Sequence, residues 1–485
     1  MKTTTSIKAA AIAILHFTFS ILHFTAHGAV IQQVIVRQQW PWSTDVKVEY
    51  KLAEVTAPVD ISVKAFNGNT ELPLPAEAVS GDLYGISESG IGQFIIDPVK
   101  AFGNTKVAIA DFRVELELSE SAANIGEVLY KIFDLENGGD PKEVTRADLL
   151  NGMYGSVVTN FASLGEGFYS PATDVLIWTG VTNDVKYKTT HLVMRKIPAK
   201  NQTFAMGSPS SEVGRSKFVT DSENQVGVRF TNDYYVAVFE LTQKQYKFIN
   251  NNAAPSAYTG EDADWHPVEK VSYNTLRGAY NSVGPSGEKI NWPTNAYMHE
   301  VYGGSVMAKL RTKFSNEYEF DLLTEAQWEY ACRAKTTTAF NNGKNLESVG
   351  TYNSPNLESI AWYISSDAEA QAGNNTTHVV GMKAPNAWGL YDMHGNVGEI
   401  CLDVAPVTNI NPDSLSELLD PPGLAPTRVD SYRIVRGGAS RRASWSARSA
   451  ARRDSNGNTQ IYCGGSTGEN SMVGVRVTFP VHGTD

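Results

Sequence analysis

The stretch Gly389-Leu-Tyr-Asp-Met-His-Gly-Asn-Val-Gly-Glu399 restricts the fold of this chain more than any other feature, because generic folding chemistry does not demand such a string. Two further glycine motifs follow it downstream, Arg436-Gly-Gly438 and Val473-Gly-Val-Arg-Val477. The chain has no cysteine between Leu402 and Tyr462. Any chemistry in the segment after the Arg-Gly-Gly turn must therefore proceed without a thiol.

The length and charge of the chain limit what it can be. Its 485 residues suit two or three domains. The net charge is -11, whereas a nucleic-acid partner needs a basic stripe, so we predict no nucleic-acid binding. One basic cluster can meet an anionic ligand or pair with the chain's own carboxylates, and both alternatives stay open. Its members are Arg433, Arg436, Arg441, Arg442, Arg448, Arg452 and Arg453.

The N-terminal residues have the pattern of a secretory signal peptide. Lys2 and Lys8 precede an apolar run over residues 9–24, and Ala26-His-Gly28 supplies a small-residue cleavage site. A membrane anchor is the alternative, but this run is short and polar residues interrupt it. We therefore predict a signal peptide over residues 1–28, an exported protein that is periplasmic or extracellular, and no stable membrane insertion.

The three cysteines, Cys332, Cys401 and Cys463, cannot frame the fold with disulfides. An odd number in an exported chain leaves at least one cysteine unpaired. The sequence leaves open which pair would form, with free buried thiols as the alternative.

Residues 29–118 read as an all-β domain, because apolar and polar residues alternate in short runs separated by turn residues. The runs are Val34–Val36, Val46–Tyr50, Ile61–Ala65, Phe94–Ile96 and Val107–Leu118. This pattern predicts an immunoglobulin-like β-sandwich. Residues 119–186 are mixed, and we interpret them as a connector in which Arg146–Leu150 begins a short helix.

Two capping boxes predict helices in the C-terminal part. Thr242 is followed by Gln245, and Thr324 by Gln327, so each threonine can accept from an early amide while its glutamine reaches back. In the second helix, Trp328 and the residues three and four positions later form one apolar face. We expect that face in the core.

Five blocks between residues 187 and 485 resemble, in order, the motifs of the formylglycine-generating, sulfatase-modifying-factor enzyme family. The blocks are Phe204–Pro209, Tyr234–Tyr246, His266–Ser272, Leu323–Arg333 and the opening string Gly389–Glu399. The resemblance implies an α+β domain over residues 187–485 with the family's irregular fold, which is related to C-type lectins.

The resemblance also implies a structural calcium in the loop of the opening string. Carried over by position, Asp392 and Glu399 would give carboxylates, and Met393, Gly395 and Val397 would give backbone carbonyls. Calcium takes six to eight hard oxygens, and a glycine allows the bend that turns carbonyls inward. A plain turn with two solvated acids is the alternative.

Relatives that oxidise a sulfatase cysteine bind Cu(I) through two closely spaced thiols, which suit a soft ion. Here Ala447 stands where many bacterial relatives have a cysteine, and the serines nearby have little affinity for Cu(I). We therefore predict no copper site and assign no catalytic residue. Gly398-Glu-Ile400 replaces the family's Trp-Glu-Trp, which places the usual mode of substrate binding in doubt.

The sequence thus predicts an exported, calcium-stabilised family member that has lost the cysteine pair and serves as a ligand-binding or scaffold protein. Its partner would be an unknown protein or glycan. The expected ligand surface comprises Arg441, Arg442, Ser444, Trp445 and Arg448. The alternative is a working formylglycine-generating oxidase.

Overall fold

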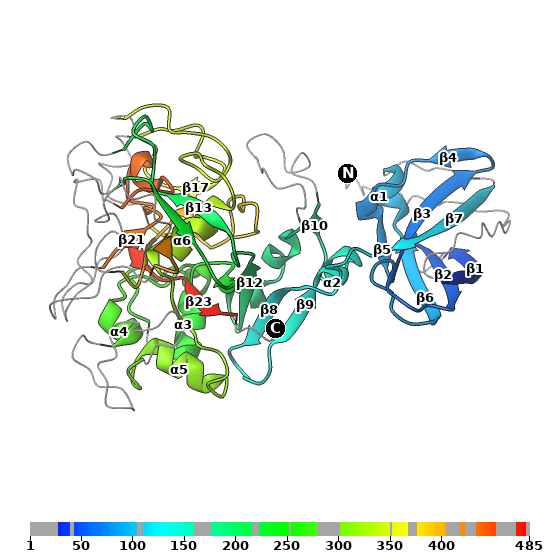
Figure 1. Cartoon of the computed structure of the whole chain (residues 1–485), viewed down its shortest axis with the longest axis horizontal. Helices are drawn as coiled ribbons and strands as arrows, with labels where there is room; N and C mark the ends of the chain where they lie inside the picture. The colour runs from blue at the N-terminus through cyan, green and yellow to red at the C-terminus, as the bar shows by residue number, and fades with distance from the viewer. Residues whose placement is uncertain are drawn as a thin grey trace, which may run out of the picture. The chain divides into compact units, whose positions relative to one another are not determined.

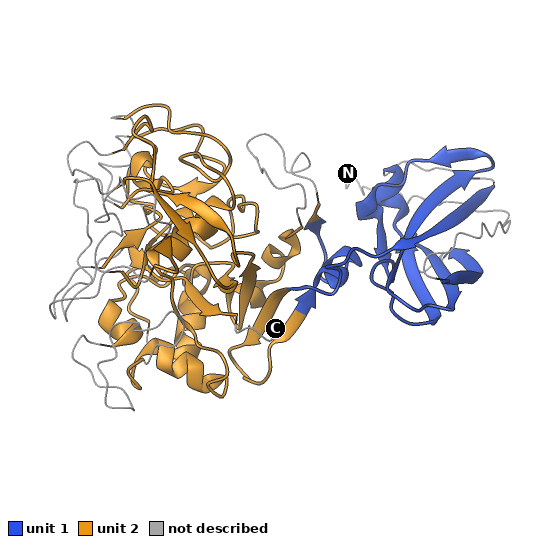
Figure 2. Cartoon of the chain, viewed as in Figure 1, with its two compact units in different colours: residues 1–128, 144–157 blue, residues 129–143, 158–485 orange. Residues whose placement is uncertain are grey.

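The computed structural model describes residues 28–38, 43–103, 109, 111–159, 176–215, 223–251, 254–278, 301–349, 352–366, 376–403, 418–421, 433–452 and 472–481. The chain divides into two compact units (Figure 2). Unit 1 comprises residues 1–128 and 144–157, and unit 2 comprises residues 129–143 and 158–485. The segment predicted as a connector is thus shared by the two units. The signal-peptide core, Arg453 and Cys463 lie outside the described residues.

Unit 1 is a β-sandwich of two antiparallel sheets. The four-stranded sheet has the order β1-β2-β6-β5, with β1 Val30–Gln38, β2 Val46–Ala53, β5 Val79–Gly81 and β6 Gly90–Ile96. The three-stranded sheet has the order β4-β3-β7, with β3 Val59–Asn67, β4 Thr70–Leu72 and β7 Phe112–Glu120. The order of the first sheet is the A-B-E-D order of an immunoglobulin domain.

The core of unit 1 follows from strand alternation. Val46, Val48 and Tyr50 on β2 are buried, and they share one cluster with Ile61 of β3 and Phe94 of β6. Side chains at alternate positions point to the same face of a strand, so each sheet presents one apolar face to the other. Two short helices complete the unit, α1 Pro98–Phe102 and α2 Arg146–Leu150, with a 3₁₀ turn at Ala76–Ala78. The helix expected at residue 146 is therefore confirmed.

Unit 2 is built on a six-stranded sheet of order β16-β23-β15-β12-β8-β9. Figure 1 labels four of its strands, β8, β9, β12 and β23. Its strands are β8 Val128–Asp134, β9 Lys142–Thr145, β12 His191–Ile197, β15 Tyr234–Ala237, β16 Asp321–Leu322 and β23 Val477–Pro480. The C-terminal strand β23 thus lies between β15 and β16.

Shorter elements surround this sheet. The remaining strands are β10 Val157–Val158, β11 Ile177–Trp178, β13 Thr203–Met206, β14 Val226–Arg229, β17 Ala361–Trp362, β18 His394–Gly395, β19 Gly398–Ile400, β20 Leu418–Leu419, β21 Val435–Arg436 and β22 Val473–Gly474. The α-helices are α3 Gln243–Ile249, α4 Tyr273–Arg277, α5 Val306–Lys313 and α6 Glu325–Arg333. The 3₁₀ helices are η3 Thr179–Thr182, η4 Val185–Lys188, η5 Ala263–Trp265 and η7 Ser444–Ala447.

Both predicted capping boxes are present. Thr242 caps α3 together with Gln245, and Thr324 caps α6 together with Gln327. Trp328 on α6 is fully buried, as its position on the apolar face predicted. The α+β class expected from the sequence is confirmed. Within the described residues, no helix has the length and apolar character needed to cross a bilayer.

Candidate functional site

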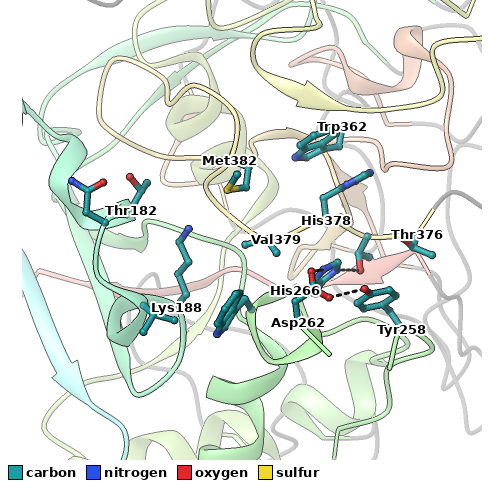
Figure 3. Close-up of a pocket in the computed structure, with 14 residues that line it drawn as sticks. Thr182, Lys188, Tyr258, Asp262, His266, Trp362, Thr376, His378, Val379 and Met382 are labelled. Carbon is teal, nitrogen blue, oxygen red and sulfur yellow. Dashed lines mark hydrogen bonds and ion pairs between the residues drawn. The ribbon is translucent and has the colours of Figure 1, made fainter. Parts of the chain in front are cut away.

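A cavity of about 580 Å³ opens in unit 2 (Figure 3). Its walls come from η3 and η4, from the turn around η5, from β17, and from the segment after residue 375. Its lining residues are Thr182, Asn183, Val185, Lys188, Tyr258, Asp262, Trp265, His266, Trp362, Thr376, Thr377, His378, Val379 and Met382. This volume lies in the range of small-molecule pockets, about 300–1,000 Å³.

One wall is ordered by a chain of hydrogen bonds through His266. Its Nδ1 lies 2.9 Å from Thr377 Oγ1, and its Nε2 lies 3.3 Å from Asp262 Oδ2. The ring stacks on Tyr258 at 4.1 Å, and the Tyr258 hydroxyl donates to Asp262 at 2.6 Å. Burial lowers the pKa of His266, so the ring is neutral at pH 7. The tautomer with its proton on Nε2 satisfies both contacts, because Nδ1 can then accept from the threonine.

The opposite wall presents Trp362, whose two faces are already covered. The His378 ring stacks on it at 3.9 Å, and Lys383 Nζ lies 4.1 Å from its centroid. The indole Nε1 is buried and meets no hydrogen-bond acceptor among the described residues. A buried, unpaired N–H is costly, so a ligand acceptor at this edge would be stabilised.

Lys188 places a cation at the cavity wall (Figure 3). Its side chain is buried at the end of η4, and burial lowers the pKa of its ammonium while Asp392 works in the other direction. The ligand would thus meet one ammonium, one carboxylate from Asp262 and the edges of aromatic side chains within a single cavity.

A second cavity of about 330 Å³ adjoins the first, since Tyr258, Thr376 and Thr377 line both. Glu269 and Arg441 also line it. Together the two cavities connect the aromatic wall with the segment that follows the Arg-Gly-Gly turn.

The predicted calcium loop lies beside the larger cavity, and its two acids differ. Asp392 is buried, its Oδ2 accepts from Gly381 N at 2.6 Å, and its Oδ1 has no partner among the described residues. Burial raises the pKa of Asp392 to about 6. Both oxygens of Glu399 accept from Arg476, and Oε2 also accepts from Trp328 Nε1 at 2.6 Å.

The residues that were expected to supply carbonyls are all buried, at positions 393, 395 and 397. The Val397 amide donates to Glu240 Oε1, a third buried carboxylate that sequence reasoning missed. The parts of the chain described contain no group of three or more histidine, cysteine, aspartate or glutamate side chains that could hold a metal. Arg476 is hydrogen-bonded to both oxygens of Glu399 in this structure, so a calcium ion at this loop would have to displace that pairing. Calcium binding stays a prediction, which a melting temperature measured with calcium and with a chelator checks.

Two of the five residues of the expected ligand surface are buried, two are half-buried and one is exposed. Arg448 is buried, and its NH1 lies 2.5 Å from Glu212 and 3.0 Å from Glu223. Ser444 is buried in η7, and Trp445 packs beside Tyr352 at 6.0 Å. Arg442 is half-buried, whereas Arg441 is exposed and lines the smaller cavity. Buried carboxylates explain the position of Arg448, which the sequence had placed at the surface.

The same explanation covers the basic cluster. Arg436 pairs with Glu329 and Glu325, and Arg452 pairs with Glu325, all with buried side chains. Burying a charge is costly unless it is paired and hydrogen-bonded. For Arg436, Arg448 and Arg452, pairing with the chain's own carboxylates is therefore the alternative that holds.

Two of the three cysteines lie in the core. Cys332 and Cys401 are free and fully buried. Burial raises the pKa of Cys332 to about 12 and that of Cys401 well above its ordinary value. Both are therefore protonated thiols at pH 7 when no metal is bound.

Acid is expected to weaken the folded protein through His394. Nδ1 of this buried ring donates to the Ala447 carbonyl at 2.6 Å, and Nε2 accepts from the Asn341 amide at 3.1 Å. Burial lowers its pKa from 6.5 to about 4. An unfolded chain binds this proton more readily, so stability that is complete above pH 6.5 falls between pH 6.5 and 4, by about 3 kcal/mol.

The measurement is the free energy of unfolding from pH 7.5 to pH 4.5, beside the variant His394→Gln. Glutamine keeps a donor and an acceptor without a titrating group, so the variant should lose less stability over this range. Equal acid sensitivity of the two proteins would show that His394 does not carry the effect.

None of the residues that line the larger cavity was among the site residues expected from the sequence. The block His266–Ser272 carries the family resemblance, but nothing in it connects its histidine with a site. The spacing of Asp262 and His266, four residues apart, was a local signal that could have found this pair. Nothing local connects either residue with Trp362 or His378.

Comparison with known proteins identifies the family. The model of the sulfatase-modifying factor enzyme 1-like domain matches residues 189–476. The chaperone protein LppX of Paenibacillus barcinonensis is 27% identical over 181 residues, which is 35% of this chain and 61% of that protein. This chain therefore spans less than two thirds of that relative's length.

Two solved structures are similar to this chain. Treponema denticola variable protein 1 gives a TM-score of 0.40 at 22% identity, covering 60% of this chain and 96% of that one. PvdO from Pseudomonas aeruginosa gives 0.39 at 22% identity, covering 60% and 94%. The family model covers more than half of the 485 residues, including all five blocks noted in the sequence. The chain belongs to the sulfatase-modifying factor enzyme 1-like family.

Proposed function

We propose that unit 2 binds a protein or glycan ligand in the 580 Å³ cavity and does not oxidise cysteine. The observation that carries this proposal is the buried indole N–H of Trp362, a residue of the cavity wall, which has no acceptor among the described residues and so leaves a costly donor unpaired. A mostly apolar lining with a few placed polar groups is what a recognition site needs. Export, proposed from residues 1–28, would present this cavity outside the cytoplasm.

The surroundings of Ala447 support a non-oxidising role. This position, which carries a cysteine in many bacterial relatives, is a buried methyl group packed with Phe340, Leu346 and Leu357. Cys332 and Cys401, the two cysteines that the structure describes, are buried in the core and lie outside this segment. The alternative, a formylglycine-generating oxidase, predicts conversion of a Cys-x-Pro-x-Arg peptide in the presence of oxygen and copper. Mass spectrometry of that peptide, beside an active relative, should detect no conversion.

Trp265→Ala is expected to weaken ligand binding by about tenfold or more, since buried tryptophan contacts often dominate binding. Trp265 lines the cavity and is 41% exposed, so its removal spares the core. The full-length mature protein would be screened on glycan and peptide arrays, and each ligand found would be titrated by calorimetry.

Tyr302→Ala is the matched control, because Tyr302 has 48% exposure and does not line the cavity. This variant should bind as the wild type does. A ligand whose affinity is unchanged by Trp265→Ala, or that is affected equally by both substitutions, would place recognition elsewhere and contradict the proposal.

A further inference from the structure

The smaller cavity holds a second unsatisfied group. Glu269 lies in the segment between η5 and α4 and is 1% exposed. Its Oε1 accepts from the backbone amides of Ala257 and Tyr258, at 2.5 and 3.2 Å. Its Oε2 is buried and has no hydrogen-bond partner among the described residues. The two backbone amides fix the carboxylate and leave its second oxygen without a donor.

A buried carboxylate oxygen of this kind favours a cationic donor. Hydrogen bonds between ionised groups are about twice as strong as neutral ones. The two backbone amides already occupy Oε1, so a guanidinium that binds both carboxylate oxygens would lack one acceptor. An ammonium is a point charge that needs a single strong acceptor. Thr259, Thr376 and Thr377 line the same cavity, and a threonine hydroxyl is able to accept one of the remaining N–H groups.

We propose that the 330 Å³ cavity receives the primary ammonium of a lysine side chain from a peptide ligand, bound at Glu269 Oε2. This inference rests on the proposed function, because the peptide backbone beside that lysine would lie in the adjoining larger cavity. There the open Trp362 N–H can donate to a peptide carbonyl.

The depth of Glu269 favours a peptide over an amino sugar. Its open oxygen is buried, so the ammonium must reach it on a narrow, flexible stem. Lysine has a four-carbon stem, whereas the nitrogen of an amino sugar is attached directly to a bulky ring. Tyr258 lines both cavities, so a lysine entering the smaller one leaves its backbone near the larger one.

Arg441 is the opposing charge in this cavity. It is exposed and already takes part in another interaction of the chain. A guanidinium in the same cavity repels an ammonium, and this gives the proposal a second test with the opposite sign.

The test uses ligand-observed NMR on the full mature chain with Nα-acetyl-lysine N-methylamide as the probe. The matched probe Nα-acetyl-norleucine N-methylamide keeps the stem and both amides but lacks the ammonium. The wild type should bind the lysine probe at least about tenfold more tightly than the norleucine probe, as one charged hydrogen bond allows. Equal binding, or a preference for glucosamine oligomers, would overturn the proposal without any variant.

Two variants locate the ammonium. Glu269→Gln should remove the preference for lysine over norleucine, and Arg441→Gln should increase it. A Glu269→Gln protein that keeps the preference would overturn the assignment, as would an Arg441→Gln protein that loses it. Trp265→Ala separates the two proposals: array ligands that depend on Trp265 but show no lysine preference support the proposed function and sink this inference alone.

Discussion

Replacing Arg476 with methionine should lower the free energy of unfolding of unit 2 by about 3–5 kcal/mol, the usual effect of removing one partner of a buried ion pair. Arg476 is 1% exposed, and its guanidinium contacts both oxygens of Glu399. It also donates to the carbonyls of Ala237, Val238 and Tyr391. Methionine fills most of the volume but leaves those acceptors unpaired and an uncompensated carboxylate in the core.

The neighbouring acids make the loss larger than for an isolated pair. Glu240 and Asp392 both feel the charge of Arg476, and the pKa of Glu240 is raised by burial and by Asp392. Without the arginine, the nearby acids repel each other more strongly in a medium of low dielectric constant. The variant should therefore recover part of its stability at low pH, as these carboxyls become protonated.

Unfolding in guanidinium chloride, followed by tryptophan fluorescence, measures the loss of stability in the Arg476 variant, because Trp328 and Trp388 are buried in unit 2. Lys247→Met is the control. Lys247 pairs with Asp264 at 2.7 Å, with side chains 32% and 36% exposed, and such a pair contributes about 0–1 kcal/mol. Equal losses in the two variants would refute the claim that the buried network stabilises unit 2.

Gly395→Ala should destabilise unit 2 by at least about 3 kcal/mol, because two independent penalties add. Gly395 has φ +85, a conformation that costs a residue with a Cβ about 1–2 kcal/mol. An added Cβ would also lie 2.0 Å from the carbonyl oxygen of Trp362. That oxygen belongs to the strand partner, since β17 and β18 pair Trp362 with Gly395, so it cannot move without breaking the pairing.

Thermal unfolding by circular dichroism checks this, with Gly227→Ala as the control. Gly227 lies in β14, and an added Cβ there meets nothing within 4 Å. The control should change stability by less than about 1 kcal/mol. A Gly395→Ala protein as stable as the control would mean that the loop can relax. Because Trp362 lines the larger cavity, a folded variant should also lose ligand affinity.

Local patterns in the sequence predicted local structure well. The capping boxes at Thr242 and Thr324 are present because a threonine and a glutamine three residues apart satisfy each other's backbone amides without help from the rest of the chain. Strand alternation predicted the sandwich for the same reason, because every second residue along β2 meets the core.

The expected ligand surface shows where local reasoning stops. Arg448 is as polar as Arg441, and nothing in the intervening sequence separates an interior residue from an exposed one. The difference is that Glu212 and Glu223, more than 200 residues earlier, lie within ion-pair distance of Arg448. Only the fold brings those carboxylates there and makes burial of the arginine tolerable.

The sequence by itself determined the family, the α+β class, the β-sandwich that precedes the main domain, and the lack of a thiol pair after the Arg-Gly-Gly turn, because each of these is written in contiguous residues. The tertiary structure alone decided the candidate site. Segments around residues 185, 262, 362 and 378 meet at the larger cavity. Glu269, which has one unpartnered carboxylate oxygen, lines the smaller cavity beside it. A cavity is a property of packing between distant segments, and no single segment carries a signal for the space that all of them leave open.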